Sequence, residues 1–368
     1  MAAVTTGGQL AAFDLAPTDC ERCLLWGRCP APGTEAACSE IGLRPWQPDF
    51  DAQFEQVRGP DLAVTVARPQ AHLDLPDFVA PIDGTSICAN LHRPWVAIRL
   101  TDWLKRSRAG QASGLSMHVG LGIDARTRVL LVMFANDALL EGQIWPGRHQ
   151  FAGSLGLWRP DAVAVPDFSV WLHDSWLERQ FAIVRSLRFF ELLQEHGITA
   201  VPHVFWGDPC QLQEWVSWIR TNPVEWIAMD VQCLQPALRP MYLAELREFR
   251  EALGVAPRLL VGGTSDAQWM RSLRAVWPGA AFTANVSVLA HKRRYLLPHR
   301  DGSVARVVWG GADPADLLVR EVERLEGILS EELTFPWATA SQDAWTARWN
   351  SGRPVARRGT RDQRYVHP

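Results

Sequence analysis

The sequence predicts an α/β protein, a (βα)8 TIM-like barrel, preceded by a small N-terminal four-cysteine metal module. Two observations lead to this prediction. From Leu62 onward, short β-rich runs alternate with amphipathic stretches, and four of the seven cysteines fall within the first 38 residues. Such alternation is typical of strand-helix units that feed a parallel sheet. Eight candidate strands favour a closed barrel, and an open doubly wound sheet is the alternative.

The candidate strands are short runs rich in β-branched and aromatic residues, at 62–66, 95–100, 129–134, 162–165, 199–206, 226–231, 258–261 and 281–286. Helices are expected at 102–108, 175–195, 211–221, 243–253, 266–276 and about 314–332. Asp208 and Asp266 mark two helix starts, whereas Gly197 marks a helix end. In the first half of the chain only the helix at 102–108 is expected. The segment LSMHVGLGI is a candidate for an additional strand, which would spoil the count of eight.

Composition divides the chain into four parts. We expect a flexible N-terminus at 1–17, the metal-binding module at 18–60, the barrel-like domain at 61–335 and an Arg-rich C-terminal tail at 336–368. A length of 368 residues suits one large domain with a small appendage. The 18 tryptophans mostly lie beside apolar residues, which favours packing in the core over stacking on bases.

Charge and hydropathy exclude several classes of protein. A formal net charge of -3 argues against a protein that coats nucleic acid by bulk electrostatics, although local basic patches are still available. The N-terminus lacks a basic start followed by an apolar run, so we expect no signal or transit peptide. No stretch reaches the roughly 18 to 20 uninterrupted apolar residues of a membrane span. These observations predict a cytoplasmic protein with no membrane partner.

The N-terminal module holds four cysteines in the pattern C-x2-C-x5-C-x8-C, namely Cys20, Cys23, Cys29 and Cys38. Four thiols in one short segment, without a secretory signal, indicate a metal site more than disulfides. The uneven spacing and a Cys-Pro pair resemble iron-sulfur ligation, whereas zinc sites usually show two close pairs. We therefore expect a [4Fe-4S] cluster, with Zn2+ as the alternative. Three isolated cysteines are expected to be small buried hydrophobic residues, namely Cys88, Cys210 and Cys233.

Polar residues at the carboxyl ends of the predicted strands form the candidate active site, because loops and helix N-termini converge there in parallel α/β folds. Asp137, Asp167 and Asp230 follow or end apolar runs, where an unpaired carboxylate would be costly. Paired carboxylates can serve as nucleophile and as general acid or base. The alternative is that Asp167 caps a turn and that Asp230 satisfies backbone groups. His203 is a further catalytic candidate, or else a satisfied core histidine.

Other residues near the strand ends are candidates for substrate binding, namely Phe168, Ser169, Trp206, Gln232, Gly262, Gly263 and Asn285. The two glycines precede a predicted helix, so their backbone amides could approach an anion, and a plain turn is the alternative. A dense basic cluster follows the last predicted strand. Its Lys292, Arg293 and Arg294 are expected to contact the phosphates of DNA or RNA, and a solvated surface run is the alternative.

Three segments resemble an uncharacterised family of bacterial, phage and mobile-element proteins known only as a domain of unknown function. They are FANDALLEGQIW, the PDFS turn at 166–169, and a G-x4-P-x3-W strand that begins at Gly197 and ends at Trp206. In the first segment the matching residues are Asp137, Glu141 and Trp145. The resemblance covers roughly 128–265 and implies a phage or mobile-element context without an established chemistry. The family usually has two acidic residues where this chain has Asn136 and Asp137.

A fainter similarity, at the level of topology, is to the (βα)8 barrels of tRNA-guanine transglycosylases and their DNA-modifying relatives. It depends on the order of an early aspartate, a PD pair and the segment RLLVGGTSD. The nucleophilic aspartate that this similarity implies after the next strand is missing, since AFTANVSVL offers Thr283 and Asn285 instead. The C-terminal zinc pattern of those enzymes is absent as well.

Together these patterns predict an enzyme of phage or mobile-element origin that modifies nucleic acid or a nucleobase through strand-end carboxylates. Two other classes stay open. One is a non-catalytic, metal-stabilised binding or regulatory protein of a replication, transfer or defence complex, and the other is an iron-sulfur redox protein. A concave acidic pocket would favour the enzyme, whereas exposed tryptophans and arginines without such a pocket would favour the binding protein. The sequence does not specify the substrate or any protein partner.

Overall fold

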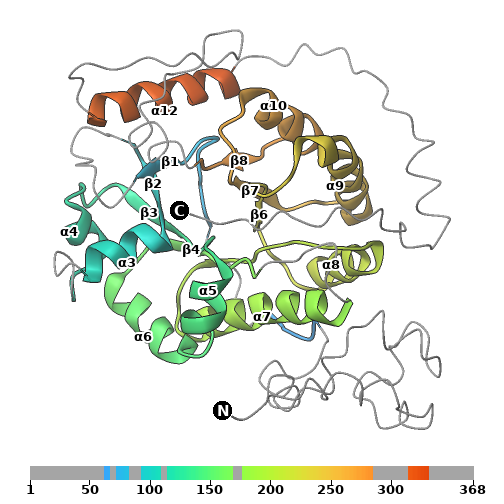
Figure 1. Ribbon diagram of the computed structural model, residues 1–368, viewed down its shortest axis with the longest axis horizontal. Coiled ribbons are helices and arrows are strands. Elements are labelled where there is room, and N and C mark those ends of the chain that lie inside the picture. Colours follow the sequence, from blue (N-terminus) through green and yellow to red (C-terminus); the bar gives the residue numbers. More distant parts are fainter. Residues whose placement is uncertain are drawn as a thin grey trace, which may run out of the picture.

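The computed structural model describes residues 62–66, 72–82, 93–108, 114–168, 176–284 and 314–330. Short parallel strands occupy the centre, and helices surround them (Figure 1). The strands form two sheets, one with five strands in the order β1-β2-β3-β4-β5 and one with three in the order β6-β7-β8. The fold class is therefore mixed α/β with parallel sheets, as the alternation of strands and helices predicts.

The strands are β1 (Ala80–Ile82), β2 (Trp95–Arg99), β3 (Arg128–Val132), β4 (Ala162–Ala164), β5 (Ala200–Val201), β6 (Trp226–Asp230), β7 (Arg258–Gly262) and β8 (Ala281–Phe282). All but β1 overlap a predicted strand. The expected strand at 62–66 is wrong, because side chains of a neighbouring helix take its polar groups. Trp218 Nε1 donates to the Val64 carbonyl at 2.7 Å, and the Val66 amide donates to Asn222 Oδ1 at 2.8 Å.

Backbone hydrogen bonds also link the two sheets at both of their edges. Beyond the end of β5, the Val204 amide donates to the Ala228 carbonyl of β6 at 2.8 Å. Just before β1, the Val79 amide donates to the Phe282 carbonyl of β8 at 2.8 Å. The eight strands are thus linked side by side in chain order, and the last is linked to the segment that enters the first.

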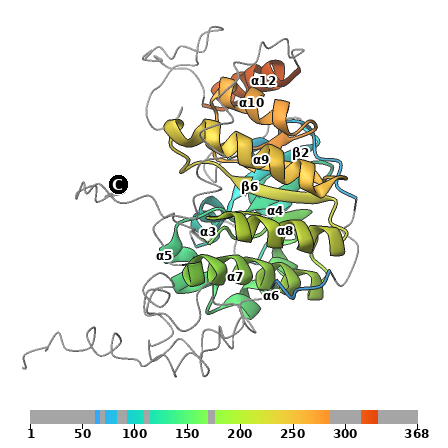
Figure 2. The same cartoon turned by 90° about the vertical axis from the view of Figure 1, so that its right-hand side faces the viewer.

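The helices are α3 (Leu100–Arg108), α4 (Met117–Leu121), α5 (Asp137–Leu139), α6 (Arg148–Trp158), α7 (Trp176–Glu195), α8 (Pro209–Thr221), α9 (Arg239–Leu253), α10 (Ala267–Val276) and α12 (Pro314–Ser330). A π-helix, η5 (Leu140–Ile144), continues α5, and a 3-10 turn, η6 (Pro236–Leu238), precedes α9. Figure 2 shows α7, α8, α9, α10 and α12 following one another along one side of the strands. Among the described residues, no helix has both the length and the apolar character that crossing a membrane requires.

Two predicted helix starts and one predicted helix end are confirmed. Asp208 and Asp266 each accept a hydrogen bond from the backbone amide three residues later, at 3.0 and 3.2 Å, and so cap α8 and α10. Gly197 follows α7 with a φ of 71°, a conformation that glycine adopts without strain.

The first half of the chain contains more helix than predicted. The segment LSMHVGLGI forms α4, not an additional strand, because Ser116 caps the helix and Gly122 ends it in the left-handed conformation. The helix α6 was not expected, since Gly153 and Gly156 lower the helix propensity of its sequence. Packing of its apolar side overrides that propensity through the buried residues Phe151, Ala152, Leu155 and Trp158.

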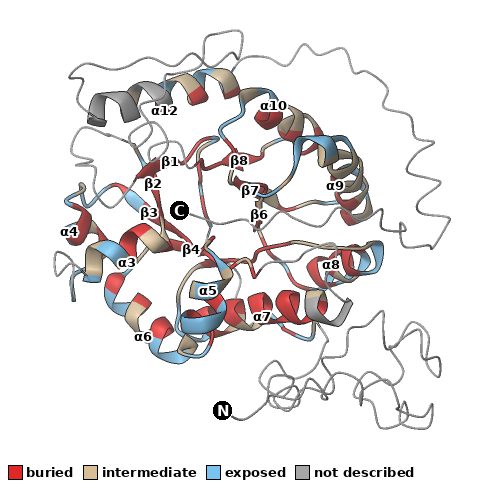
Figure 3. Ribbon diagram, in the orientation of Figure 1, coloured by how far each residue is buried: buried red, intermediate tan, exposed pale blue. Residues whose placement is uncertain are grey.

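Strand side chains alternate between two apolar clusters. Figure 3 shows that most strand residues are buried. One face of each strand packs against the helices, for example through Val96 and Ile98. The opposite face forms a separate interior cluster, to which Trp95, Ala97 and Val132 belong. The expected packing of tryptophans in the core is confirmed at Trp95, Trp215 and Trp226, which are all buried.

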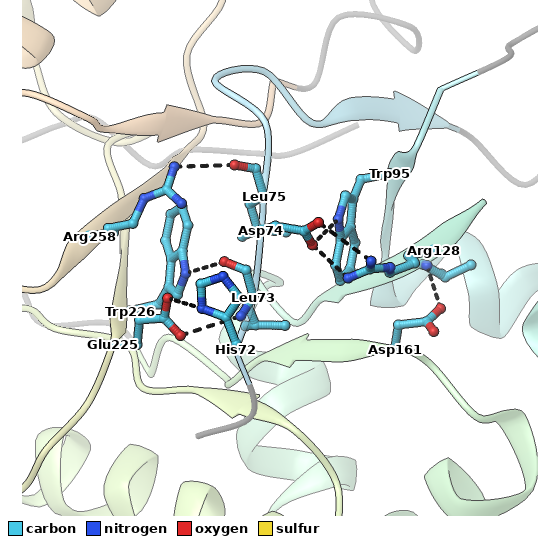
Figure 4. A network of polar contacts seen from close by, with 11 residues as sticks. His72, Leu73, Asp74, Leu75, Trp95, Arg128, Asp161, Glu225, Trp226 and Arg258 are labelled. Atoms are coloured by element: carbon cyan, nitrogen blue, oxygen red, sulfur yellow. Dashed lines mark hydrogen bonds and ion pairs between the residues drawn. The ribbon is translucent and has the colours of Figure 1, made fainter. Parts of the chain in front are cut away.

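A segment that precedes β1 covers the amino ends of the strands (Figure 4). Arg128, the first residue of β3, donates to Asp74 Oδ1 at 2.6 Å. Its guanidinium lies 5.2 Å from the ring centroid of Trp95, the first residue of β2. Trp95 Nε1 donates to the same carboxylate at 3.4 Å. Asp74 is thereby held across two neighbouring strand starts.

The same segment also contacts the starts of β6 and β7 (Figure 4). Trp226 Nε1 donates to the Leu73 carbonyl at 2.9 Å, and Arg258 Nη2 donates to the Leu75 carbonyl at 3.3 Å. The Arg258 guanidinium lies 4.1 Å from the Trp226 ring centroid. Since the side chains of Leu73 and Leu75 are buried in the interior cluster, the segment closes the amino ends of the strands. A ligand can therefore approach the described strands at their carboxyl ends.

Candidate active site

The three predicted aspartates meet at the carboxyl ends of the strands. Asp137 begins α5 shortly after β3, Asp167 follows β4, and Asp230 ends β6. The charges of Asp137 and Asp230 both act on Asp167, and the charges of all three aspartates act on the thiol of Cys233. We call Asp137, Asp167 and Asp230 the acidic site. Its assembly follows from the parallel sheets, whose strands all deliver their carboxyl ends to one side.

Asp167 combines buried and reachable atoms. Its residue surface is partly accessible, but its Oδ1 is buried and has no hydrogen-bond partner among the described residues. Burial raises the pKa of this carboxyl well above its usual value, and the charges of Asp230 and then of Asp137 add to the shift. The amides of Asp167 and Ala135 donate to the carboxyl and oppose that shift.

Asp230 lies on the interior face of β6, two residues after Ala228 of the interior cluster. Burial raises the pKa of its carboxyl to about 6, against the effect of the Gln232 amide, which donates to Oδ1 at 2.7 Å. Burial thus favours the protonated form of both carboxyls, and the charge of Asp230 further favours a proton on Asp167. A pair that holds one proton, with one carboxylate and one carboxylic acid, is the arrangement that general acid-base and nucleophilic chemistry use.

Two glycines leave space for the side chains at the acidic site. Gly263 has a φ of 83°, and a Cβ atom there would overlap Asp230 Oδ1 and the Gln232 amide nitrogen. A Cβ atom at Gly262 would overlap the ring of Phe134. Close packing of the end of β7 against these neighbours thus explains why glycine occupies both positions. The predicted approach of their amides to an anion stays a prediction.

His203 lies just beyond β5, beside β6. Its side chain, and not a backbone carbonyl, accepts the hydrogen bond of the Asp230 amide. The Asp230 amide donates to His203 Nε2 at 2.9 Å. The imidazole is 3% exposed, with ring centroids 4.8 Å from Phe134 and 5.2 Å from Phe205. Burial lowers the pKa of His203 to about 3, so the ring is neutral at physiological pH. His203 therefore positions the backbone of Asp230, and its Nδ1 has no partner in the described part of the chain.

The segments that resemble the domain-of-unknown-function family contact one another. Glu141 Oε1 pairs with Arg185 Nη2 of α7 at 2.8 Å. The Arg185 guanidinium lies 4.7 Å from the ring centroid of Phe168, and the ring of Trp145 meets Phe168 edge-on at 5.8 Å. Phe168 is 1% exposed, so its described contacts are those of packing. This cluster attaches the helix that begins at Asp137 to the turn that contains Asp167.

Asn136, where the family usually has an acid, has a structural role in this chain. Its Oδ1 accepts a hydrogen bond from the Leu139 amide at 2.9 Å and caps α5, of which Asp137 is the first residue. An aspartate could make the same cap. The departure from the family therefore leaves the position of Asp137 intact.

Trp206 lies beside the site and packs on α9. Its ring stacks on Tyr242 with centroids 5.5 Å apart and an interplanar angle of 3°, and its Nε1 donates to Glu245 Oε2 at 3.0 Å. Burial raises the pKa of the Tyr242 hydroxyl, and the charges of Glu245 and Asp230 add to the effect. Tyr242 and Cys233 are two neighbours of Asp230 that the sequence reasoning missed. Cys233 could have been recognised as a neighbour of the site, because it follows the end of β6 closely in the sequence.

Several predictions fall outside the described residues or need correction. The outside group comprises the four module cysteines Cys20, Cys23, Cys29 and Cys38, together with Cys88, Ser169, Asn285, Lys292, Arg293 and Arg294. The expected burial of Cys210 and Cys233 is wrong, since both are free and exposed in residue surface. Within the described ranges, no group of three or more His, Cys, Asp or Glu side chains is arranged to hold a metal ion.

Comparisons with known proteins add little to this geometry. No protein-family model matches the chain, and no curated protein matches it. A solved structure described as "Native KDPGal structure" aligns with a TM-score of 0.36 and 13% sequence identity, over 70% of this chain and 98% of that chain. A similarity of this size supports no conclusion about fold or chemistry.

The contact between Gly263 and Asp230 makes a prediction with a matched control. Gly263→Ala places a Cβ atom on Asp230 Oδ1, whereas Gly279→Ala has a similar φ of 80° and no heavy atom within 4 Å of the added Cβ. Both variants pay the cost of a left-handed alanine, about 1 kcal/mol. We expect Gly263→Ala to lose at least 1 kcal/mol more in its free energy of unfolding, because something must move. Equal losses in urea denaturation would contradict the close packing.

The raised pKa of Asp230 predicts how stability depends on pH. The folded protein holds this proton more tightly than the unfolded chain, with a pKa of about 6 against 3.8, so the contribution of Asp230 to wild-type stability falls as the pH rises from about 4 to about 6. Asp230→Asn lacks the cost of a buried charge. We expect the variant to be more stable than wild type near pH 7.5, on the order of 2 kcal/mol, with the difference vanishing near pH 4. Denaturation curves at both pH values measure this, and a less stable variant near pH 7.5 would contradict it.

Proposed function

We propose that the eight strands and their helices form a closed (βα)8 barrel. Support comes from the hydrogen bonds that link the sheets at both edges, from the interior cluster, and from the segment at 72–75 that covers the amino ends. An open doubly wound sheet has two free edges and would lack one of these links. Barrels of this kind place their chemistry at the carboxyl ends of the strands, where the acidic site lies.

We propose that the chain is an enzyme that modifies a nucleobase in nucleic acid, in a phage or mobile-element context. The observation on which this depends is the pair formed by Asp167 and Asp230, two buried carboxyls whose pKa values are both raised, and we assign the shared proton to Asp167, where the charge of Asp230 adds to the shift. Structural ion pairs lower carboxyl pKa values, whereas burial raises the pKa of both carboxyls here, which is typical of sites that exchange protons with a substrate. The nucleobase substrate is inferred from the transglycosylase similarity, and the basic segment at 291–294 is suited to phosphates.

Base exchange is the reaction that these two groups suit best. Ionised Asp230 attacks C1′ of the nucleoside, and the bond from C1′ to the base breaks as Asp167 gives its proton to the leaving base. The incoming base then attacks C1′ and displaces Asp230, and it returns a proton to Asp167. Both carboxyls end in their starting states, and no oxidant or reductant is consumed. In this scheme Asp230 replaces the aspartate that the resembling enzymes carry after the next strand.

Nucleosides from cells that express the chain test this function. Total DNA and tRNA are digested and compared by liquid chromatography and mass spectrometry for wild type, Asp167→Asn and Asp230→Asn. The control is Asp124→Asn, which removes an exposed carboxylate paired with Arg126 before β3. We expect a modified nucleoside whose yield falls about 100-fold or more in the two site variants but not in the control. Equal yields in all four proteins would exclude the acidic site as the catalyst.

We propose that the four cysteines Cys20, Cys23, Cys29 and Cys38 bind a [4Fe-4S] cluster or Zn2+ beside this domain. Elemental analysis after anaerobic purification measures iron, sulfide and zinc per chain. About four iron and four sulfide, lost in Cys→Ser variants, would establish a cluster, and about one zinc would establish a structural site. Absence of all three would contradict the module. A cluster that is reversibly reduced without any base modification would favour the redox alternative.

A further inference from the structure

Three arginines occupy interior positions of the described strands, and one of them lies at the end that a ligand can approach. Arg128 begins β3 and Arg258 begins β7, so both lie at the amino ends. Their guanidinium groups hold the covering segment through Asp74 and the Leu75 carbonyl. Arg99 ends β2 and therefore lies at the carboxyl ends, on the side of the acidic site. The covering segment does not explain an arginine at that position.

The alternation of side chains along β2 directs Arg99 to the interior. Trp95 and Ala97 belong to the interior cluster, whereas Val96 and Ile98 pack on the side of the helices. The next interior position along the strand is that of Arg99. A charged side chain is costly to bury, and Arg99 is only half-buried, with 29% of its side chain exposed. The guanidinium can therefore meet a ligand at the rim of the strands.

Asp102, in the first turn of α3, holds the Arg99 guanidinium by one edge. Arg99 Nε donates to Asp102 Oδ2 at 2.7 Å, and Nη2 lies at the same distance from that oxygen. A guanidinium has five N–H groups, so at least three of them have no partner in the part of the chain that the structure describes. Because the Asp102 carboxylate is buried, it fixes the orientation of the guanidinium and leaves the other edge available.

The charges around Arg99 sum to a positive value. Lys105 Nζ lies 3.9 Å from Asp102 Oδ1, so two cations share one carboxylate and the three groups together carry +1. The acidic site, in contrast, contributes only negative charge and repels an anionic substrate. A guanidinium is well suited to offset that repulsion for a phosphate, because its planar fork binds two phosphate oxygens at once.

Arg99 and the acidic site lie at the same edge of one sheet. Arg99 pairs in register with Val132, the last residue of β3, and Asp137 begins the helix that follows this strand. Asp167 follows β4, the next strand of the sheet. Neighbouring strands are about 4.8 Å apart, so the ends of β2 and β4 lie roughly 10 Å from each other. A base that enters the acidic site carries a sugar with a phosphate on either side, and one of these can meet Arg99.

We propose that Arg99 binds a phosphate of the nucleic acid, next to the nucleotide whose base enters the acidic site. Asp102 positions the guanidinium, and Lys105 adds positive charge at the same rim. The group that is recognised is the phosphodiester, which DNA and RNA share. This inference depends on the proposed function and adds a substrate-binding residue to it.

The salt dependence of binding tests the inference on the purified full chain. Fluorescence anisotropy measures the affinity for labelled single strands of 12 nucleotides with mixed sequence, one of DNA and one of RNA. The logarithm of the association constant falls with the logarithm of the salt concentration by about 0.7 per phosphate contact in single strands. We expect Arg99→Gln to weaken the binding of at least one strand about tenfold at about 0.1 M salt and to reduce the slope by about 0.7.

Three further variants separate a phosphate contact from a structural role. Arg126→Gln is the matched control, because Arg126 also pairs with a nearby aspartate but precedes β3 at the amino ends, and it should keep the wild-type slope. Arg99→Lys keeps the charge and should keep the slope. Arg99→Gln leaves the buried Asp102 without a partner and so could disturb folding. The double variant Arg99→Gln, Asp102→Asn removes both charges, and it should unfold at the wild-type temperature while its slope stays reduced.

Each outcome decides the inference separately from the proposed function. An unchanged slope in Arg99→Gln, a wild-type slope in the double variant, an equal reduction in Arg126→Gln, or no binding of either strand at about 0.1 mM protein would overturn the phosphate contact. If base modification in cells still depends on Asp167 and Asp230, the proposed function then stands without it. A reduced slope in Arg99→Gln with no modified nucleoside in cells would leave the phosphate contact standing and refute the catalytic proposal.

Discussion

Hydrogen bonds between the outer strands of the two sheets determine where the side chains of the acidic site lie. The bonds at Val204 and Val79 link the eight strands on both sides, so alternate residues must face inward. Inward positions toward the amino ends are filled by tryptophans and by Leu73 and Leu75. Since that end is covered, polar groups on the inner face can meet a ligand at the carboxyl ends, where Asp167, His203 and Asp230 lie.

The acidic site is costly to the fold, and neighbouring residues are arranged to hold it. Because Gly263 has no side chain, the Asp230 carboxyl fits beside it. His203 Nε2 accepts the hydrogen bond of the Asp230 amide. Glu141 and Arg185 attach the helix that carries Asp137. Such an arrangement keeps two carboxyls close at the expense of stability, which is the usual relation between catalytic sites and folding free energy. The proposed base exchange uses the unequal protonation that results.

The sequence predicted the second half of the fold better than the first, for physical reasons. Asp208, Asp266 and Gly197 signal helix boundaries locally, and the structure confirms them. The helix α6 depends on tertiary packing against its weak propensity, so no local signal announced it. The run at 62–66 looked like a strand because its apolar residues alternate, but Trp218 and Asn222 bind it to a helix. A shared site was predicted for Asp137, Asp167 and Asp230 because each residue ends or follows a strand. Their shared electrostatics, and the hydrogen bond from the Asp230 amide to His203, depend on distances that a linear sequence does not contain.

The proposed base exchange depends most directly on the proposed unequal protonation of Asp167 and Asp230. Carboxyl 13C NMR of protein labelled at its aspartates follows each side chain through a pH titration, and Asp167→Asn and Asp230→Asn identify the two signals. We expect Asp230 to titrate near pH 6 and Asp167 to remain protonated at higher pH, with each midpoint lowered when the other residue is replaced. Midpoints near the ordinary aspartate value of about 4 for both residues, unaffected by the partner's substitution, would contradict the account.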